Sequence, residues 1–97
     1  MAKVEVGTLI NASGSESTVH PSNGKKFSLT DLQTLVRGDI EIVPMRPGNG
    51  HAIMYCNEEG KYKPDFQPNP RATALANIQP DDYLVGPILI VRKEVAQ

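Results

Sequence analysis

Apolar residues along the chain fall into short runs and alternations that are typical of β-strands. Residues 4–10 alternate and then become apolar, and residues 51–56 are apolar at nearly every position, which predicts a central strand for the second range. Further strands are predicted at 18–20, 40–43 and 83–91. The last range contains Gly86-Pro87, which indicates a bulge or an edge position, because proline lacks the N–H that a sheet interior requires.

The strongest helical pattern lies at residues 29–37, where four apolar side chains repeat at helical spacing on one face. This spacing predicts a helix that packs on the sheet. Ser28 is the expected N-cap, with Asp31 as its acidic capping partner. Gly38 follows as the expected C-terminal stop.

The segments between these elements are rich in turn residues. Gly60 ends a tight turn over residues 57–60 and is expected to take a positive φ. Two prolines leave residues 61–68 irregular, after which Asn69 is expected to cap a short helix over residues 70–76. A flexible loop and two turns are also predicted at residues 11–17, 21–25 and 45–50.

The length and the order of elements define the expected fold class. The 97 residues are enough for one domain, 1–97, with a modest core. The order strand, short strand, helix, strand, strand, helix, strand predicts a small α+β domain. Its sheet is expected to be mostly antiparallel, with one main helix and one short helix.

Composition excludes several classes of partner. Ten basic and 11 acidic residues give a net charge of −1, so the chain has no general attraction for nucleic-acid phosphates. The chain has no tryptophan and only five other aromatic residues, which is few for a surface that stacks the bases of single-stranded nucleic acid. A nucleic-acid partner is therefore not expected.

The single cysteine and the hydropathy pattern indicate a soluble intracellular protein. Cys56 is the only cysteine and cannot form a disulfide within the chain, which fits a reducing cytoplasm. No apolar run approaches the roughly 18 residues of a membrane span, and the N-terminus lacks the apolar core of a signal peptide. We expect no membrane association.

Four blocks of the sequence, in this order, resemble a known family: LQTLVRGDIEIVPM, NEEGK, NPRATAL and DDYLVGPILIV. They are similar to successive blocks of small phage and plasmid proteins catalogued as domain of unknown function 3846. The blocks span about residues 29–91. Pro87 departs from the pattern, since such strands usually carry a small or acidic residue there, and the first 27 residues match no block.

The resemblance implies a mobile-element origin, and hence action in the cytoplasm of an infected or plasmid-bearing host bacterium. It carries over no catalytic residue, because the family is defined without an activity. Candidate chemistry therefore has to come from the residues themselves.

The turn at Asn57, Glu58, Glu59 and Lys61 is the first candidate binding feature. It would place two carboxylates and an amide at the edge of a pocket. A turn with acids and a glycine at a strand end is, however, also an ordinary way to make a soluble hairpin. Adjacent glutamates need not point the same way, so paired acid–base catalysis is not expected.

The helix start at Asn69, Arg71 and Thr73 is the second candidate. Free backbone N–H groups and the helix dipole suit phosphate or carboxylate, and Arg71 and Thr73 would add a guanidinium and a hydroxyl. The alternative is that Asn69 only caps the helix and Arg71 is solvated. If Asn57 and Asn69 lie close together, the two features form one polar corner, whose acids would bind sugar hydroxyls or base N–H groups.

Metal and nucleophile chemistry is not expected. His51 and Cys56 are five positions apart on one predicted strand, so their side chains face opposite sides and cannot share a metal. No CxxC or HxxxH spacing is present, which argues against a structural zinc site. Cys56 lies in an apolar strand, where a small buried side chain is more typical than a thiolate. We expect no cofactor and no enzyme activity.

Three classes of function remain open. The first is a small-ligand binder that sequesters a nucleotide-derived host immune signal, and such a small binder is expected to be a homo-oligomer with pockets between subunits. The second is a protein-binding module that inhibits a host enzyme or defence protein through an exposed strand edge and the 45–50 hairpin. The third, an enzyme or nucleic-acid binder, is disfavoured by composition. The expected ligand contacts of the first class are Asn57, Glu58, Glu59, Lys61, Asn69, Arg71 and Thr73.

Overall fold

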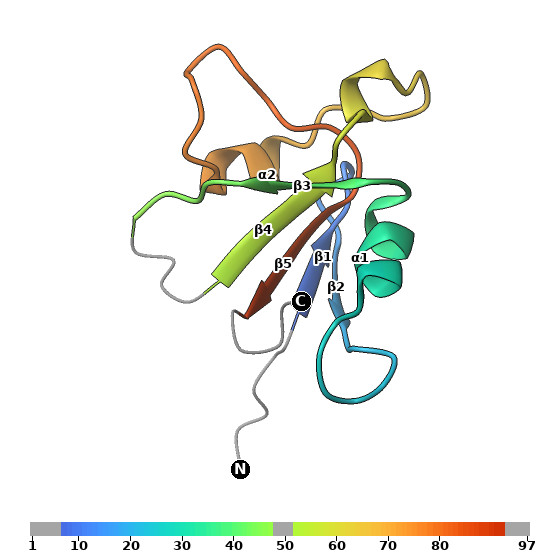
Figure 1. Cartoon of the computed structure of the whole chain (residues 1–97). Helices are drawn as coiled ribbons and strands as arrows, with labels where there is room; N and C mark the ends of the chain where they lie inside the picture. Colours follow the sequence, from blue (N-terminus) through green and yellow to red (C-terminus); the bar gives the residue numbers. More distant parts are fainter. Residues whose placement is uncertain (1–6, 48–51, 93–97) are drawn as a thin grey trace.

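A computed structural model describes residues 7–47 and 52–92 as one antiparallel sheet with a helix on each face (Figure 1). The elements are β1 (Gly7–Ile10), β2 (Glu16–Val19), α1 (Leu29–Val36), β3 (Ile40–Val43), β4 (Ala52–Asn57), the 3₁₀ helix η1 (Gly60–Tyr62), α2 (Pro70–Leu75) and β5 (Ile88–Arg92). The five strands lie in the order β2-β1-β5-β4-β3, and every neighbouring pair is antiparallel. This architecture confirms the predicted α+β class, with one main and one short helix.

The side chains of the sheet divide between two layers of core. On β4, Tyr55 points to the α1 side and packs with Leu32 and Leu89. Its neighbours Met54 and Cys56 point to the opposite side, where α2 packs. Because both faces of β4 are covered and it lies between β5 and β3, the prediction of a central strand in this region is confirmed.

The closing strand is shorter and more central than predicted. The prediction of a strand from residue 83 is wrong at its beginning, because β5 starts at Ile88. Gly86 has φ +74°, which interrupts the extended path before that point. An edge position is also wrong: β5 lies between β1 and β4. Pro87 stands just before Ile88, the first paired residue of β5, so its missing N–H removes no bond from the β5 ladder.

Helix α1 begins as predicted and ends one residue earlier. The Ser28 Oγ accepts a hydrogen bond from the Asp31 N–H at 3.0 Å, and the Asp31 carboxylate accepts one from the Ser28 N–H at 3.1 Å. The helix ends at Val36, and Arg37 takes the left-handed conformation (φ 67°) in place of the glycine expected to stop it. At Gly38 a Cβ would lie 2.5 Å from Asn57 Nδ2, so close packing also requires this glycine.

Gly60 corrects a second expectation about turns. Its φ is not positive, and it is the first residue of η1. Because η1 extends to Tyr62, the stretch 61–68 is not wholly irregular, contrary to the prediction from the sequence. Gly60 is buried, and a Cβ there would lie 3.0 Å from Val85 Cγ2. Packing, rather than backbone conformation, accounts for this glycine.

The remaining elements agree with the sequence to within a few residues. β2 covers residues 16–19 instead of 18–20, because residues 16 and 17 pair with β1. Asn69 caps α2 as predicted, with Pro70 at the first position. Residues 4–6 and 48–51 lie outside the described ranges, so the start of the first predicted strand, residues 48–50 of the predicted 45–50 turn, and His51 do as well.

Candidate functional site

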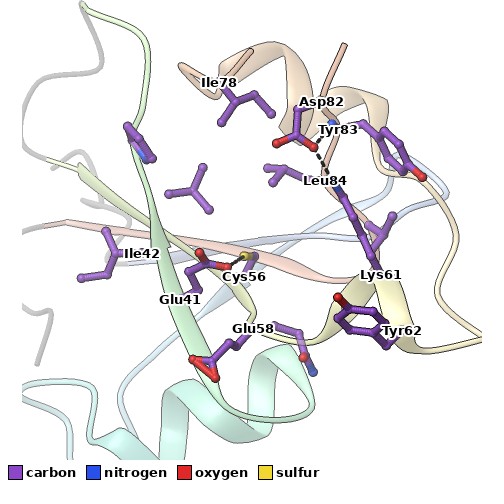
Figure 2. Close-up of a pocket in the computed structure, with 15 residues that line it drawn as sticks. Glu41, Ile42, Cys56, Glu58, Lys61, Tyr62, Ile78, Asp82, Tyr83 and Leu84 are labelled. Atoms are coloured by element: carbon purple, nitrogen blue, oxygen red, sulfur yellow. Dashed lines mark hydrogen bonds and ion pairs between the residues drawn. The ribbon is translucent and has the colours of Figure 1, made fainter. Parts of the chain in front are cut away.

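A pocket of about 520 Å³ lies beside β3 and β4, on the face of the sheet that also carries α2 (Figure 2). η1 borders it on one side, and the segment 78–85, which follows α2, folds back over the sheet and borders it on another. Its lining includes Glu41, Val43, Cys56, Lys61, Asp82 and Leu84. The volume falls in the range typical of small-molecule sites, about 300–1,000 Å³.

The floor of this pocket is apolar. Val43, Cys56 and Leu84 are all buried and belong to one core cluster. Burial, followed by the neighbouring Glu41 carboxylate, raises the pKa of the Cys56 thiol to about 11. The thiol donates a hydrogen bond to Glu41 Oε1, with 3.9 Å between the sulfur and the oxygen. Cys56 is therefore a neutral, buried side chain near pH 7, as the sequence predicted, and is not poised as a nucleophile.

One wall of the pocket is an ion pair between η1 and the 78–85 segment. The Lys61 ammonium donates to the Asp82 carboxylate and lies 4.6 Å from the centre of the Tyr83 ring. This hydrogen bond is the main cause that raises the pKa of Lys61 and lowers the pKa of Asp82. Both side chains are more than 40% exposed, so water screens the pair and its opening costs little.

The rim carries an excess of negative charge. Glu41, Glu58 and Asp82 are the acidic residues of the pocket lining, whereas Lys61 is its single basic residue. Such a rim favours ligands that donate hydrogen bonds and opposes ligands with several phosphates.

Of the expected contacts, Asn57, Glu58 and Lys61 line this pocket, and Glu59 does not. The Asn57 amide, however, is engaged within the protein. Its Nδ2 donates to the carbonyls of Val36 and Arg37 at 3.1 and 3.0 Å. Its Oδ1 accepts from the Glu59 N–H at 2.8 Å. Asn57 thus fixes the end of α1 and the turn after β4.

Asn69 is fully buried and has a similar structural role at another place. Its Nδ2 donates to the Ile10 and Gly86 carbonyls at 3.0 and 2.8 Å, and its Oδ1 accepts from the Ala72 N–H at 3.1 Å. Asn57 and Asn69 share no partner. Each holds chain segments together, and neither amide has a donor left for a ligand.

Thr73 and Arg71 also have partners within the chain. The Thr73 hydroxyl donates to the Asn69 carbonyl at 2.8 Å and accepts from the Leu84 N–H at 2.9 Å. Arg71 pairs with Glu16 of β2 and borders a separate, more open hollow. The N–H groups of Ala72 and Thr73 are bonded to Asn69, which leaves few helix donors for a phosphate.

Sequence reasoning missed Glu41, Asp82, Tyr83 and Leu84 as pocket residues. Glu41 had a usable signal, because it is the only charged residue in the strand IEIV. The other three gave no sequence signal, because they join Cys56 in the pocket lining only when the chain after α2 folds back over the sheet.

The described residues contain no group of three or more His, Cys, Asp or Glu side chains arranged to hold a metal ion. Within those same ranges, no helix has the length and hydropathy needed to cross a membrane.

Together these features define a small α+β domain built on one five-stranded antiparallel sheet, with a pocket at its β3 end. Residues 8–96 match the family described as Domain of unknown function (DUF3846), and the chain belongs to this family. The match confirms the resemblance drawn from the four sequence blocks and extends it over β1, β2 and the loops that follow. No curated protein and no solved structure matches the chain.

Proposed function

We propose that this protein binds a small ligand in the pocket between β3, η1 and the 78–85 segment. The observation that supports the proposal is the composition of that pocket: a buried apolar floor at Cys56 and Leu84 beside the rim carboxylates Glu41 and Asp82. An apolar cavity with a few convergent polar groups is the usual form of a small-molecule site.

A nucleotide-derived molecule is the ligand class that we propose. A flat base would lie on the apolar floor near the Tyr83 ring, and Glu41 would accept hydrogen bonds from base N–H groups or ribose hydroxyls. Lys61 is the one lining cation for a phosphate. The acidic rim therefore favours a nucleoside or a singly charged nucleotide over a polyphosphate.

The proposed biological role is sequestration of a host immune signal in the bacterial cytoplasm. A phage- or plasmid-encoded protein of this kind acts by holding the signal rather than by converting it. Such a protein needs no catalytic group, and we propose that it works as a homo-oligomer, since subunit contacts would enclose a pocket that is open in the single chain.

The test is native mass spectrometry of the protein purified from bacterial cells, followed by denaturing extraction. The expected result is a mass excess on the folded protein that is released as a nucleotide-like molecule, and the same spectrum gives the number of subunits. If the protein emerges without ligand, it is next incubated with a panel of nucleosides and cyclic mononucleotides. No retained mass in either experiment would contradict the proposal.

A pair of matched variants locates the site. Glu41→Gln removes a carboxylate of the pocket, whereas Glu16→Gln removes the carboxylate that pairs with Arg71 in the separate hollow. Loss of ligand is expected only for Glu41→Gln. Loss only for Glu16→Gln would move the site to the Arg71 hollow.

A further inference from the structure

β3 is an edge strand, and the hydrogen-bond register shows which of its backbone groups face outward. The Glu58 N–H donates to the Asp39 carbonyl at 2.8 Å, so Asp39 directs its backbone groups toward β4. Backbone groups alternate in direction along an antiparallel strand. Glu41 therefore also bonds to β4, whereas the N–H and C=O groups of Ile40 and Ile42 point away from the sheet.

The chain already uses the continuation of this edge for pairing. The Asn77 N–H donates to the Pro44 carbonyl at 2.8 Å, and the Arg46 N–H donates to the Leu75 carbonyl at 3.0 Å. After Asn77 the chain leaves the edge to form the far wall of the pocket. In the part of the chain that the structure describes, no strand is paired with the edge at Ile40 and Ile42.

The two faces of this open edge differ in chemistry. Ile42 is 63% exposed, and its side chain lies on the opposite side of the β3 ribbon from Cys56 (Figure 2). Glu41 lies on the pocket side, directly across from Cys56 of β4. A strand added here would therefore meet an apolar neighbour on one face and a carboxylate on the other.

The charges around the edge identify the kind of partner. Asp39, Glu41 and Glu58 are exposed acids at or beside it. Arg37, just before β3, and Lys61 of η1 are each paired with an aspartate. A second copy of this chain would bring the same acids together at the seam, which is unfavourable. A basic partner would be complementary.

We propose that the β3 edge docks an extended, basic segment of a partner protein, which adds to the sheet as a further strand. The backbone of that segment would bond to the outward N–H and C=O groups of Ile40 and Ile42. A basic side chain would lie beside Glu41, and the apolar residues on either side of it would lie beside the two isoleucines. This protein-binding role shares the Glu41 carboxylate with the proposed small-ligand site, but its backbone contacts at Ile40 and Ile42 do not require a bound ligand.

The probe is a synthetic peptide, acetyl-Ser-Val-Arg-Val-Lys-Val-Ser-amide, with an otherwise identical peptide in which glutamate replaces arginine and lysine. Binding to the full chain is followed by two-dimensional amide NMR. We expect the basic peptide to shift and protect the amides of Ile40 and Ile42, and the acidic peptide to leave them unchanged. Equal binding of both peptides, no binding, or shifts confined to other strands would overturn the proposal.

Two variants at one position separate strand pairing from simple contact. Ile42→Pro removes the outward N–H, and it leaves the ladder to β4 intact because Ile42 makes no bond to β4. Ile42→Thr keeps the N–H and loses only apolar surface. Ile42→Pro is expected to lower the affinity for the basic peptide at least about tenfold, and Ile42→Thr is expected to lower it by less. Equal affinity of Ile42→Pro and the unchanged protein would overturn the proposal, once an unchanged amide spectrum of β4 shows that the variant is folded.

Self-association is the competing outcome. Sedimentation of the unchanged protein and of Ile42→Pro decides it. A dimer that the proline variant dissociates would show that a second copy covers β3, and would overturn docking of a basic partner. A monomer, or an oligomer unaffected by Ile42→Pro, leaves the edge open for the basic segment.

Discussion

Two buried asparagines show how single residues organise this fold. Asn57 closes the end of α1 onto β4, and Asn69 ties the start of α2 to Ile10 and Gly86. An asparagine amide combines two N–H donors with an acceptor, so one side chain satisfies several backbone groups that would otherwise be buried without partners. At both positions the polar character serves the backbone.

Asn69→Ala is therefore expected to be among the most damaging single substitutions. It leaves the carbonyls of Ile10 and Gly86 without their donor and removes the cap of α2, for a loss of about 3 kcal/mol in the free energy of unfolding. Urea denaturation followed by circular dichroism measures the loss.

The neighbouring Arg71→Ala is the matched control. Its guanidinium pairs with Glu16 at the surface and is 59% exposed, so about 1 kcal/mol or less is expected. If the two substitutions cost the same, the hydrogen bonds of Asn69 contribute little, and Asn69 is not the support of α2 that its contacts indicate.

At the scale of elements, the entry into β5 depends on the contact between Gly86 and Phe66. Gly86 has φ +74°, and a Cβ there would lie 2.4 Å from Phe66 Cδ2. The Gly86 N–H donates to the Gln67 carbonyl at 2.9 Å. The glycine thus lets the chain turn tightly against a buried ring just before the central strand begins.

Gly86→Ala and Gly24→Ala separate the cost of backbone strain from the cost of the clash. Gly24 has a similar φ of +76°, but nothing lies within 4 Å of its Cβ position. Gly24→Ala is expected to cost about 1 kcal/mol from conformation alone. Gly86→Ala is expected to cost at least about 2 kcal/mol more, because the Phe66 ring has to move within the core. Thermal unfolding of both variants is the measurement, and equal melting temperatures would show that the ring shifts freely.

For the whole molecule, the charge pattern predicts how stability depends on pH. Hydrogen bonds, chiefly from the Ser28 backbone N–H to Asp31 and from the Lys61 ammonium to Asp82, lower the pKa of both carboxyl groups. A carboxyl group with a lower pKa in the folded state stabilises the protein above its unfolded pKa, and this contribution is lost as pH falls through the folded pKa.

Stability is therefore expected to be flat near neutral pH and to fall below about pH 4. Urea midpoints measured across this range test it, with Asp31→Asn as the comparison. The variant keeps an oxygen to accept from the Ser28 N–H and lacks the charge that titrates, so its stability should fall less steeply in acid. Parallel curves would mean that Asp31 does not contribute.

Local patterns in the sequence were sufficient for most of the secondary structure. The capping box at Ser28 and Asp31, the Asn69 cap and the apolar run of β4 each depend on neighbours within a few positions, and each was predicted correctly. Two predictions failed where a glycine packs against a side chain that is distant in the sequence. Gly60 packs against Val85 and does not need the positive φ that was predicted, and Gly86, just before β5, packs against Phe66.

The sequence by itself determined the fold class, the family and the main strands and helices, because periodicity and capping are local. Only the tertiary structure decided the strand order, the placing of β5 at the centre of the sheet, and the pocket. It also showed that the amides of Asn57 and Asn69, which were expected to contact a ligand, are hydrogen-bonded within the chain. The physical reason is that a buried amide is defined by which backbone groups surround it, and those groups come from segments up to 59 positions away in the chain.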